Sequence, residues 1–283
     1  MWLPVGKWHM KTRISVNGVS INVEEYGTIE QPTLVLLHGF TGSAASWGQH
    51  LDVFAHYGFR VLALDMLGHG QSDAPQDAQR YTIEQCQADI LAVLVECGVS
   101  EGEAILLGYS MGGRIALYTA FSGFFRALIL ESASPGLAEL LARAQRVKSD
   151  EQLAARIEQN GIEAFVNYWE HLPLFASQQR LPLEQRQALH EQRMQNRATG
   201  LANSLRGVGT GTQPALQERL KTLTIPVLLI TGILDSKFCT IAQHMAQSLP
   251  NARLHIVPDA GHTVHLEQPE LFDRLVHDFC LSI

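Results

Sequence analysis

The sequence is poor in cysteine, and the few cysteines it has are spread out. Among its 283 residues there are only four, and none of them stands in a CxxC spacing: Cys86, Cys97, Cys239 and Cys280. Small secreted domains need closely spaced cysteines to build a disulfide framework. We therefore expect these residues to be free thiols in a reducing compartment, and the protein to be cytoplasmic.

Long apolar runs and excess positive charge are also missing. No window approaches the roughly 20 apolar residues of a membrane span, and the N-terminus lacks the apolar region of a signal peptide, so we expect neither. The 21 basic and 28 acidic residues give a net charge of −7. This balance offers no electrostatic attraction to nucleic acid or an anionic membrane, and we expect neither as a partner.

What the sequence does contain is a series of short apolar runs bounded by Gly, Pro or Asp. The first, "ISVNGVSINVEEYG", alternates apolar and polar residues around Asn17-Gly18 and predicts an antiparallel hairpin. The later runs are continuous, as in strands buried on both faces of a parallel sheet: "TLVLLHG", "RVLALD", "AILLGYS", "ALILES", "PVLLITG" and "ARLHIVPDAG".

Helical patterns separate these runs, at Thr82–Glu96 with Thr82 as N-cap, at Met111–Phe121 and at Phe238–Leu249. Alternating strands and helices predict the α/β class, with a mostly parallel, doubly wound sheet. The alternation stops at Ser134-Pro135 and resumes at Thr224. We predict a core domain of residues 1–135 and 217–283, and a helical cap insertion of residues 136–216 at the carboxyl edge of the sheet, where such folds bind ligands.

One motif combines a strand, a tight turn and a helix. In "AILLGYSMGGRIAL", Gly108-Tyr-Ser-Met-Gly112 follows a predicted strand and opens a predicted helix. This is the setting of a nucleophile elbow, in which small residues permit a sharp turn and the serine is presented at the strand end. The alternative is a glycine-rich turn with an incidental serine. The context favours Ser110 as a catalytic residue.

A serine hydroxyl needs a base to become reactive, and the base needs an orienting acid. Asp235 and His262 both follow predicted strands, in the order Ser, acid, His that this topology favours. We predict that Asp235 orients His262 and that His262 takes the Ser110 proton. Glu131, also at a strand end, is the rival acid.

An oxyanion hole requires backbone N–H groups. Met111, directly after the serine, offers one, and Phe40 in "LLHGFTGS" is our candidate for the second, with His38 holding that loop. The pair His262 and His265 has no third ligand nearby, and the glycine-rich loop 65–73 has no phosphate-binding lysine spacing. We predict no metal and no cofactor.

Taken together, "LLHGFTGS", "DMLGHGQSD", "LLGYSMGGR", "ITGILDSKF" and "GHTVHLEQP" resemble the α/β-hydrolase superfamily over nearly the whole chain. More particularly, "GYSMGGR", "ESASPGL", "PLFASQ", "SLRGVGTGTQP" and "LDSKF" resemble the family of 2-succinyl-6-hydroxy-2,4-cyclohexadiene-1-carboxylate synthases of menaquinone and phylloquinone biosynthesis. The resemblance implies an α/β-hydrolase fold and an elimination: pyruvate leaves 2-succinyl-5-enolpyruvyl-6-hydroxy-3-cyclohexene-1-carboxylate, with the serine, histidine and aspartate acting as a base.

The implied substrate is a small molecule with three carboxylates, which guanidinium groups bind well. Arg114 lies one helical turn after Ser110. The resemblance further implies as substrate-binding residues Arg146 (or else Arg143), Arg193, Tyr109 and Trp169. Two alternatives remain at this stage, a serine-dependent carbon–carbon bond hydrolase or carboxylesterase and a non-catalytic receptor on the same fold. We expect a monomer or a weak homo-oligomer.

Overall fold

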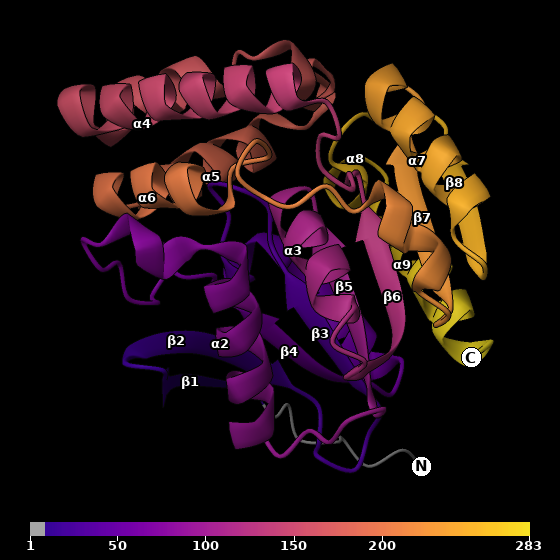
Figure 1. Cartoon of the computed structure of the whole chain (residues 1–283). Helices are drawn as coiled ribbons and strands as arrows, with labels where there is room; N and C mark the ends of the chain where they lie inside the picture. The colour runs from indigo at the N-terminus through magenta and orange to yellow at the C-terminus, as the bar shows by residue number, and fades with distance from the viewer. Residues whose placement is uncertain (1–8) are drawn as a thin grey trace.

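The computed structural model describes residues 9–283, so residues 1–8, which belong to the segment assessed for a signal peptide, lie outside it. Eight strands form one sheet in the order β1-β2-β4-β3-β5-β6-β7-β8 (Figure 1). The strands are β1 His9–Val16, β2 Val19–Tyr26, β3 Thr33–Leu37, β4 Arg60–Leu64, β5 Ala104–Tyr109, β6 Phe125–Glu131, β7 Val227–Gly232 and β8 Ala252–Val257. β1 pairs with β2, and β2 with β4, antiparallel; the pairs from β4 to β8 are parallel.

The helices are α1 Gln49–His56, α2 Ile83–Glu96, α3 Met111–Ala120, α4 Leu140–Trp169, α5 Leu183–Met194, α6 Ala198–Val208, α7 Ser236–Ser248, α8 Val264–Glu267 and α9 Pro269–Leu281. Four short 3₁₀ helices accompany them: η1 Ala44–Trp47, η2 Ala78–Tyr81, η3 Pro173–Arg180 and η4 Gln217–Thr222. No helix of residues 9–283 is both long and apolar enough to cross a membrane.

The sheet is covered on both faces, as the doubly wound prediction requires. Residues of α2, α3 and α7 pack on one face together with alternate strand residues such as Val35 and Leu37. Residues of α1 and α9 pack on the other face with the intervening residues Leu34 and Leu36. Because side chains alternate along a strand, one continuous apolar run supplies both layers of the core.

Most of the predicted elements are confirmed. The β1–β2 hairpin turns at Asn17-Gly18, where both residues have positive φ, and Thr82 accepts a hydrogen bond from Gln85 N–H at the start of α2. The prediction for "ARLHIVPDAG" was wrong in one respect. As the edge strand, β8 leaves Arg253, His255 and Ile256 exposed, because only one side of it is paired and the faces are incompletely covered.

The predicted insertion contains helices α4, α5 and α6 and no described strand. Its α4 and α6 share a small apolar core of their own, which includes Ile157, Phe165 and Leu201. α4 is bent at Gly161, whose φ of 80° and ψ of 176° are not helical. Figure 1 shows α4, α5 and α6 together across the upper end of the sheet, beyond the carboxyl ends of the parallel strands. The exact limits of the insertion stay a prediction.

Candidate active site

Ser110 sits at the junction of β5 and α3 with an unusual backbone conformation. Its φ is 51° and its ψ is −107°, a region that residues with a side chain seldom adopt. A side chain on Gly112 would approach the carbonyl oxygen of Leu37 to 2.2 Å, so the turn requires glycine there. Such strain concentrates at functional sites. The tight turn therefore presents Ser110 at the strand end, as the motif predicted.

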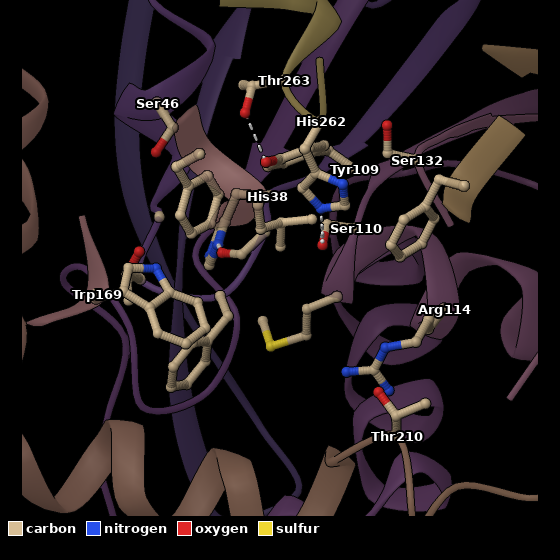
Figure 2. A pocket seen from close by; sticks show the side chains of 18 of the residues that line it. His38, Ser46, Tyr109, Ser110, Arg114, Ser132, Trp169, Thr210, His262 and Thr263 are labelled. Carbon is tan, nitrogen blue, oxygen red and sulfur yellow. Dashed lines mark hydrogen bonds between the residues drawn. The ribbon is translucent and has the colours of Figure 1, made fainter. Parts of the chain in front are cut away.

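The structure brings Ser110, His262 and Asp235 together, and Figure 2 shows the contact between Ser110 and His262. The His262 Nδ1–H donates to Asp235 Oδ2 over 2.7 Å, and the Ser110 hydroxyl lies 2.9 Å from His262 Nε2. His262 is 1% exposed and Asp235 9%. These contacts fix the tautomer in which Nε2 can accept the serine proton. The three residues have the geometry of a nucleophile, a base and an orienting acid.

The rival acid, Glu131, has a different partner. It is fully buried and accepts hydrogen bonds from the backbone N–H and from Nδ1–H of His265, the latter over 2.7 Å. The loop after β8 thus carries two histidine–carboxylate pairs three residues apart, and only the His262 pair reaches Ser110. The geometry favours Asp235 over Glu131 as the orienting acid.

Phe40 and Met111 both line the same cavity as Ser110. Met111 is the first residue of α3, so its N–H has no acceptor in its own helix. Beside Phe40, the Nδ1–H of His38 donates to Gly39 O over 2.7 Å, and the Met66 N–H donates to His38 Nε2 over 2.9 Å. Burial lowers the pKa of His38 to about 4, so its ring is neutral and braces the loop. Phe40 and Met111 stay our proposed oxyanion hole.

The cavity has a volume of about 240 Å³ and lies between the core and the cap helices. All five residues predicted to bind substrate line it: Tyr109, Arg114, Arg146, Trp169 and Arg193. The indole N–H of Trp169 is buried without a hydrogen-bond partner among the described residues, although its ring packs on Phe40, Phe165 and Phe175. An unpaired donor on the wall is suited to a polar ligand.

Two of the arginines raise the positive charge of one end of the cavity. Arg114 donates from Nη1 to Val208 O and Gln213 Oε1, and Arg146 donates from Nε to Asp150. Within residues 9–283, these bonds leave Nη2 of Arg114 and both terminal nitrogens of Arg146 free. Burial, and secondly the charge of Arg146, lower the pKa of Arg114 to about 10. Arg114 is still protonated at neutral pH, and a bound anion would relieve the repulsion between the two cations.

Arg193 is more strongly engaged by the protein. It is 8% exposed and donates to Glu170 Oε1 and Gln178 Oε1, each over 3.1 Å. A guanidinium has five N–H donors, so three are left for a ligand. The neighbouring carboxylate partly offsets its charge, which makes Arg193 a hydrogen-bonding group of the wall more than a free cation.

Of the two alternatives Arg146 and Arg143, only Arg146 lines the cavity, which favours Arg146 as the proposed substrate-binding residue. Arg143 donates to the carbonyl oxygens of Gly211 and Gln213 and does not line the cavity, so it holds the loop that contains Gln213. Lys237, which was not among the predicted site residues, also lines the cavity, with its ammonium 5.7 Å from the Phe238 ring centre. Its place two residues after Asp235, in "LDSKF", was the available signal.

Among residues 9–283, no three His, Cys, Asp or Glu side chains cluster as metal ligands would. His262 and His265 use their Nδ1 atoms on different carboxylates. The loop 65–73 instead supports the fold, since Asp65 accepts from Ala44 N–H, Asn22 Nδ2 and Gln71 N–H.

Comparison with known proteins shows relatives over nearly the whole chain. Residues 34–275 match the model of the "Alpha/beta hydrolase family". A Bacillus subtilis protein, provisionally named a 2-succinyl-6-hydroxy-2,4-cyclohexadiene-1-carboxylate synthase, is 45% identical over 94% of this chain and 97% of its own length. The Salmonella typhimurium 2-succinyl-6-hydroxy-2,4-cyclohexadiene-1-carboxylate synthase is 35% identical over 84% of this chain and 89% of its own.

Solved structures also match nearly the whole chain. MenH from S. aureus superposes with a TM-score of 0.87 at 35% identity and covers 92% of this chain and 98% of that one. An esterase from Thermogutta terrifontis has a TM-score of 0.84, over 97% of this chain and 98% of its own, at only 22% identity. The esterase shares the fold, and at that identity it carries no information on the reaction.

Proposed function

Since the chain belongs to the α/β-hydrolase superfamily and, within it, to the 2-succinyl-6-hydroxy-2,4-cyclohexadiene-1-carboxylate synthases, we propose that it catalyses that synthase reaction in menaquinone or phylloquinone biosynthesis. The reaction is the elimination of pyruvate from 2-succinyl-5-enolpyruvyl-6-hydroxy-3-cyclohexene-1-carboxylate. The enzyme is a carbon–oxygen lyase. Its relatives carry enzyme names, which sets aside the alternative of a non-catalytic receptor.

The observation that carries this proposal is the coincidence of two features in one cavity. The hydrogen-bonded pair Ser110 and His262 lines the cavity. The same cavity is also lined by three arginines, Arg114, Arg146 and Arg193. Planar guanidinium groups suit a substrate with several carboxylates. A general esterase for neutral substrates has no need for three arginines beside its serine.

The proposed mechanism uses the triad as a base. His262 draws the proton from Ser110 Oγ while Asp235 stabilises the resulting imidazolium, and Ser110 Oγ removes a ring proton from the substrate. The electron pair of that C–H bond, held for a time in the succinyl enolate, forms a C2=C3 double bond. The existing C3=C4 double bond shifts to C4=C5, and the C5–O bond to the enolpyruvyl group breaks. The proton is returned to the departing enolate, which leaves as pyruvate, so no water is consumed.

The backbone N–H groups of Phe40 and Met111 act on the charge that develops during proton removal. When the ring proton leaves, negative charge spreads onto the succinyl carbonyl oxygen. Two N–H donors held in a buried site stabilise that enolate as they would a tetrahedral anion. The same hole therefore serves elimination without a covalent intermediate.

The test is incubation of the purified enzyme with the enolpyruvyl substrate in ¹⁸O-labelled water while free pyruvate is measured. We expect pyruvate release and no label from the chemical step in either product, after correction for spontaneous exchange. Uptake of label at the cleaved bond, with an acyl adduct trapped on Ser110, would identify a hydrolase instead. Absence of pyruvate release by folded enzyme would reject the synthase.

We further propose that residues 136–216 form a cap on a core of residues 1–135 and 217–283. The protein works in the cytoplasm, which agrees with four cysteines that form no disulfide. It acts as a monomer or weak homo-oligomer on a small tricarboxylate, without a metal or cofactor.

A further inference from the structure

A line of hydrogen bonds runs from the cap to the core along the cavity wall. Arg193 Nη2–H donates to Gln178 Oε1 over 3.1 Å, and Gln178 Nε2–H donates to Thr263 Oγ over 2.8 Å. Thr263 Oγ lies 2.9 Å from the hydroxyl of Tyr109, the contact drawn in Figure 2. We call these four residues the relay. All four line the cavity, and Thr263 directly follows His262.

The direction of the relay follows from what each group can donate. A guanidinium can only donate, so the oxygen of the Gln178 amide must face Arg193 and its NH₂ must face Thr263. The Thr263 oxygen therefore accepts from Gln178. Its own hydrogen has one hydrogen-bonding partner within residues 9–283, the oxygen of Tyr109.

Burial makes this direction the stable one. Gln178 is 6% exposed and Thr263 is 2% exposed. If Tyr109 donated to Thr263 instead, the Thr263 hydrogen would be buried without an acceptor, which is unfavourable. When Thr263 donates, every group between Arg193 and Tyr109 is satisfied, and the hydroxyl hydrogen of Tyr109 is left for the cavity.

We propose that Gln178 is a positioning residue that, through Thr263, turns the Tyr109 hydroxyl into a hydrogen-bond donor aimed at an anionic oxygen of the bound substrate. The identity of that oxygen as part of a carboxylate-bearing substrate rests on the proposed function. Arg193 at the head of the relay polarises each bond in the same sense. Burial raises the pKa of Tyr109, so its hydrogen is retained.

The substitution Gln178→Glu should reverse the direction of the hydrogen bond between Thr263 and Tyr109, although it replaces only the amide NH₂ by an oxygen. A carboxylate can accept from Arg193 and from Thr263, so the Thr263 hydrogen turns away from Tyr109, and Tyr109 then donates to Thr263. Gln179→Glu is the matched control, because Gln179 is the exposed neighbour on the same 3₁₀ helix.

The first readout needs no substrate. Protein labelled with ¹³C at the ζ carbon of tyrosine reports hydrogen bonding at each hydroxyl, and Tyr109→Phe identifies the Tyr109 resonance. We expect Q178E to move that resonance toward the position of a hydroxyl that donates within the protein, and Q179E to leave it in place. An unmoved resonance in folded Q178E, or an equal movement in Q179E, would overturn the inference.

The second readout is a double-mutant cycle on pyruvate release. The cycle uses T263V, because Q178E would also place a carboxylate beside Arg193 and repel the substrate independently of Tyr109. We expect Y109F to raise KM about 10-fold or more, with a smaller change in kcat, since it removes one hydrogen bond to a charged group, and T263V to raise KM in the same way. The double variant should be no worse than Y109F alone. Additive losses would show that Thr263 acts independently of Tyr109 and would reject the relay.

An inactive wild-type enzyme and a Q178E variant that does not fold both leave the relay testable. If the wild-type enzyme released no pyruvate, the proposed function would fail, while the resonance of Tyr109 would still decide the direction of the relay. If Q178E did not fold, T263V would take its place, because it removes the same donor to Tyr109 within a similar volume. An unmoved Tyr109 resonance in T263V, or a full additional loss in the Y109F background, would again reject the relay.

Discussion

The core wall and the cap wall of the cavity are built in different ways. On the core wall lie Ser110, Met111 and Phe40, for which we propose roles carried by a short hydroxyl group or by backbone N–H groups close to strand ends. On the cap wall, Arg146 and Arg193 reach the cavity from helices through long side chains. Each of these long side chains is held by a partner, Asp150 for Arg146 and Glu170 for Arg193.

The difference separates chemistry from recognition. Backbone geometry leaves little freedom, so the core wall can place a reacting oxygen within a few tenths of an ångström. A long side chain loses more entropy and depends on its partner, but it can reach a distant carboxylate. We therefore expect changes at Ser110 and the backbone groups of the core wall to act on turnover. Changes at the long arginine side chains, including Arg114 of the core helix α3, should act mainly on substrate affinity.

The largest effect is expected at the core wall, from Ser110→Ala. Without the hydroxyl no base can reach the ring proton, so kcat should fall by about 10³-fold or more, because triad members act as a unit. Steady-state pyruvate release measures the loss, and circular dichroism checks the fold. Retention of most of the turnover would show that Ser110 is not the base.

Next comes the comparison of the two histidine–carboxylate pairs. Asp235→Asn should lower kcat by about 10²- to 10⁴-fold, because His262 loses the contact that fixes its tautomer. Glu131→Gln should leave kcat nearly unchanged and lower the free energy of unfolding by about 1–3 kcal/mol, since its buried NH₂ would lack a partner. Kinetics and urea unfolding of both variants give the result. An exchange of the two outcomes would make Glu131 the catalytic acid.

The third prediction addresses recognition at the arginines. Arg114→Ala and Arg146→Ala should each lower kcat/KM by about 10- to 150-fold, mostly through KM, because each removes charge-assisted bonds to a carboxylate. Lysine at either position should recover only part of the loss, since the planar fork is missing. Arg156→Ala, on the exposed side of α4, is the control. Wild-type KM in both variants would mean that the carboxylates bind elsewhere.

The smallest effect concerns stability and not turnover. The pKa of His38 is lowered by burial from its ordinary value of 6.5 to about 4. Between pH 6.5 and pH 4, His38 is protonated in the unfolded chain and neutral in the folded protein. The free energy of unfolding therefore falls as the pH drops from 6.5 to 4. The full loss is about 3 kcal/mol for a shift of this size.

Urea unfolding at several pH values tests this contribution. His38→Gln keeps an acceptor for the Met66 N–H and should make the acid side of the stability profile less steep, whereas His56→Gln, at an exposed position, should not. The slope that remains should include His69, because burial also lowers the pKa of His69, to about 3. A profile unchanged by His38→Gln would place the acid sensitivity elsewhere.

The sequence was most informative about the strands and about residues whose position in the fold follows from their order in the chain. Apolar runs predicted the strands, the Asn17-Gly18 pair predicted the hairpin, and the order of Ser110, Asp235 and His262 placed all three at one edge of the sheet. Parallel strands that end at the same edge bring their loops together, so position in the chain becomes proximity in space.

It was least informative where two elements meet through side chains. Nothing in the sequence distinguished Gln178 from Gln179, yet one is buried on the cavity wall and the other is exposed. The role of Arg143 likewise depends on a loop almost 70 residues later in the chain. Such roles are fixed by the packing of the cap, which periodicity does not encode.

The bend in α4 at Gly161 sets one dimension of the cavity. Arg146 and Trp169 lie on the two arms of this one helix, 23 positions apart, and both line the cavity. A straight helix would hold residues so far apart about 35 Å from each other. The angle at Gly161 therefore sets how far apart these two wall residues lie. Nothing lies within 4 Å of where a side chain at position 161 would be, but the φ of 80° disfavours any residue other than glycine. We expect a substitution at this one position to alter the bend, and with it the length of acid that the cavity accepts, while the residues proposed to bind the substrate stay the same.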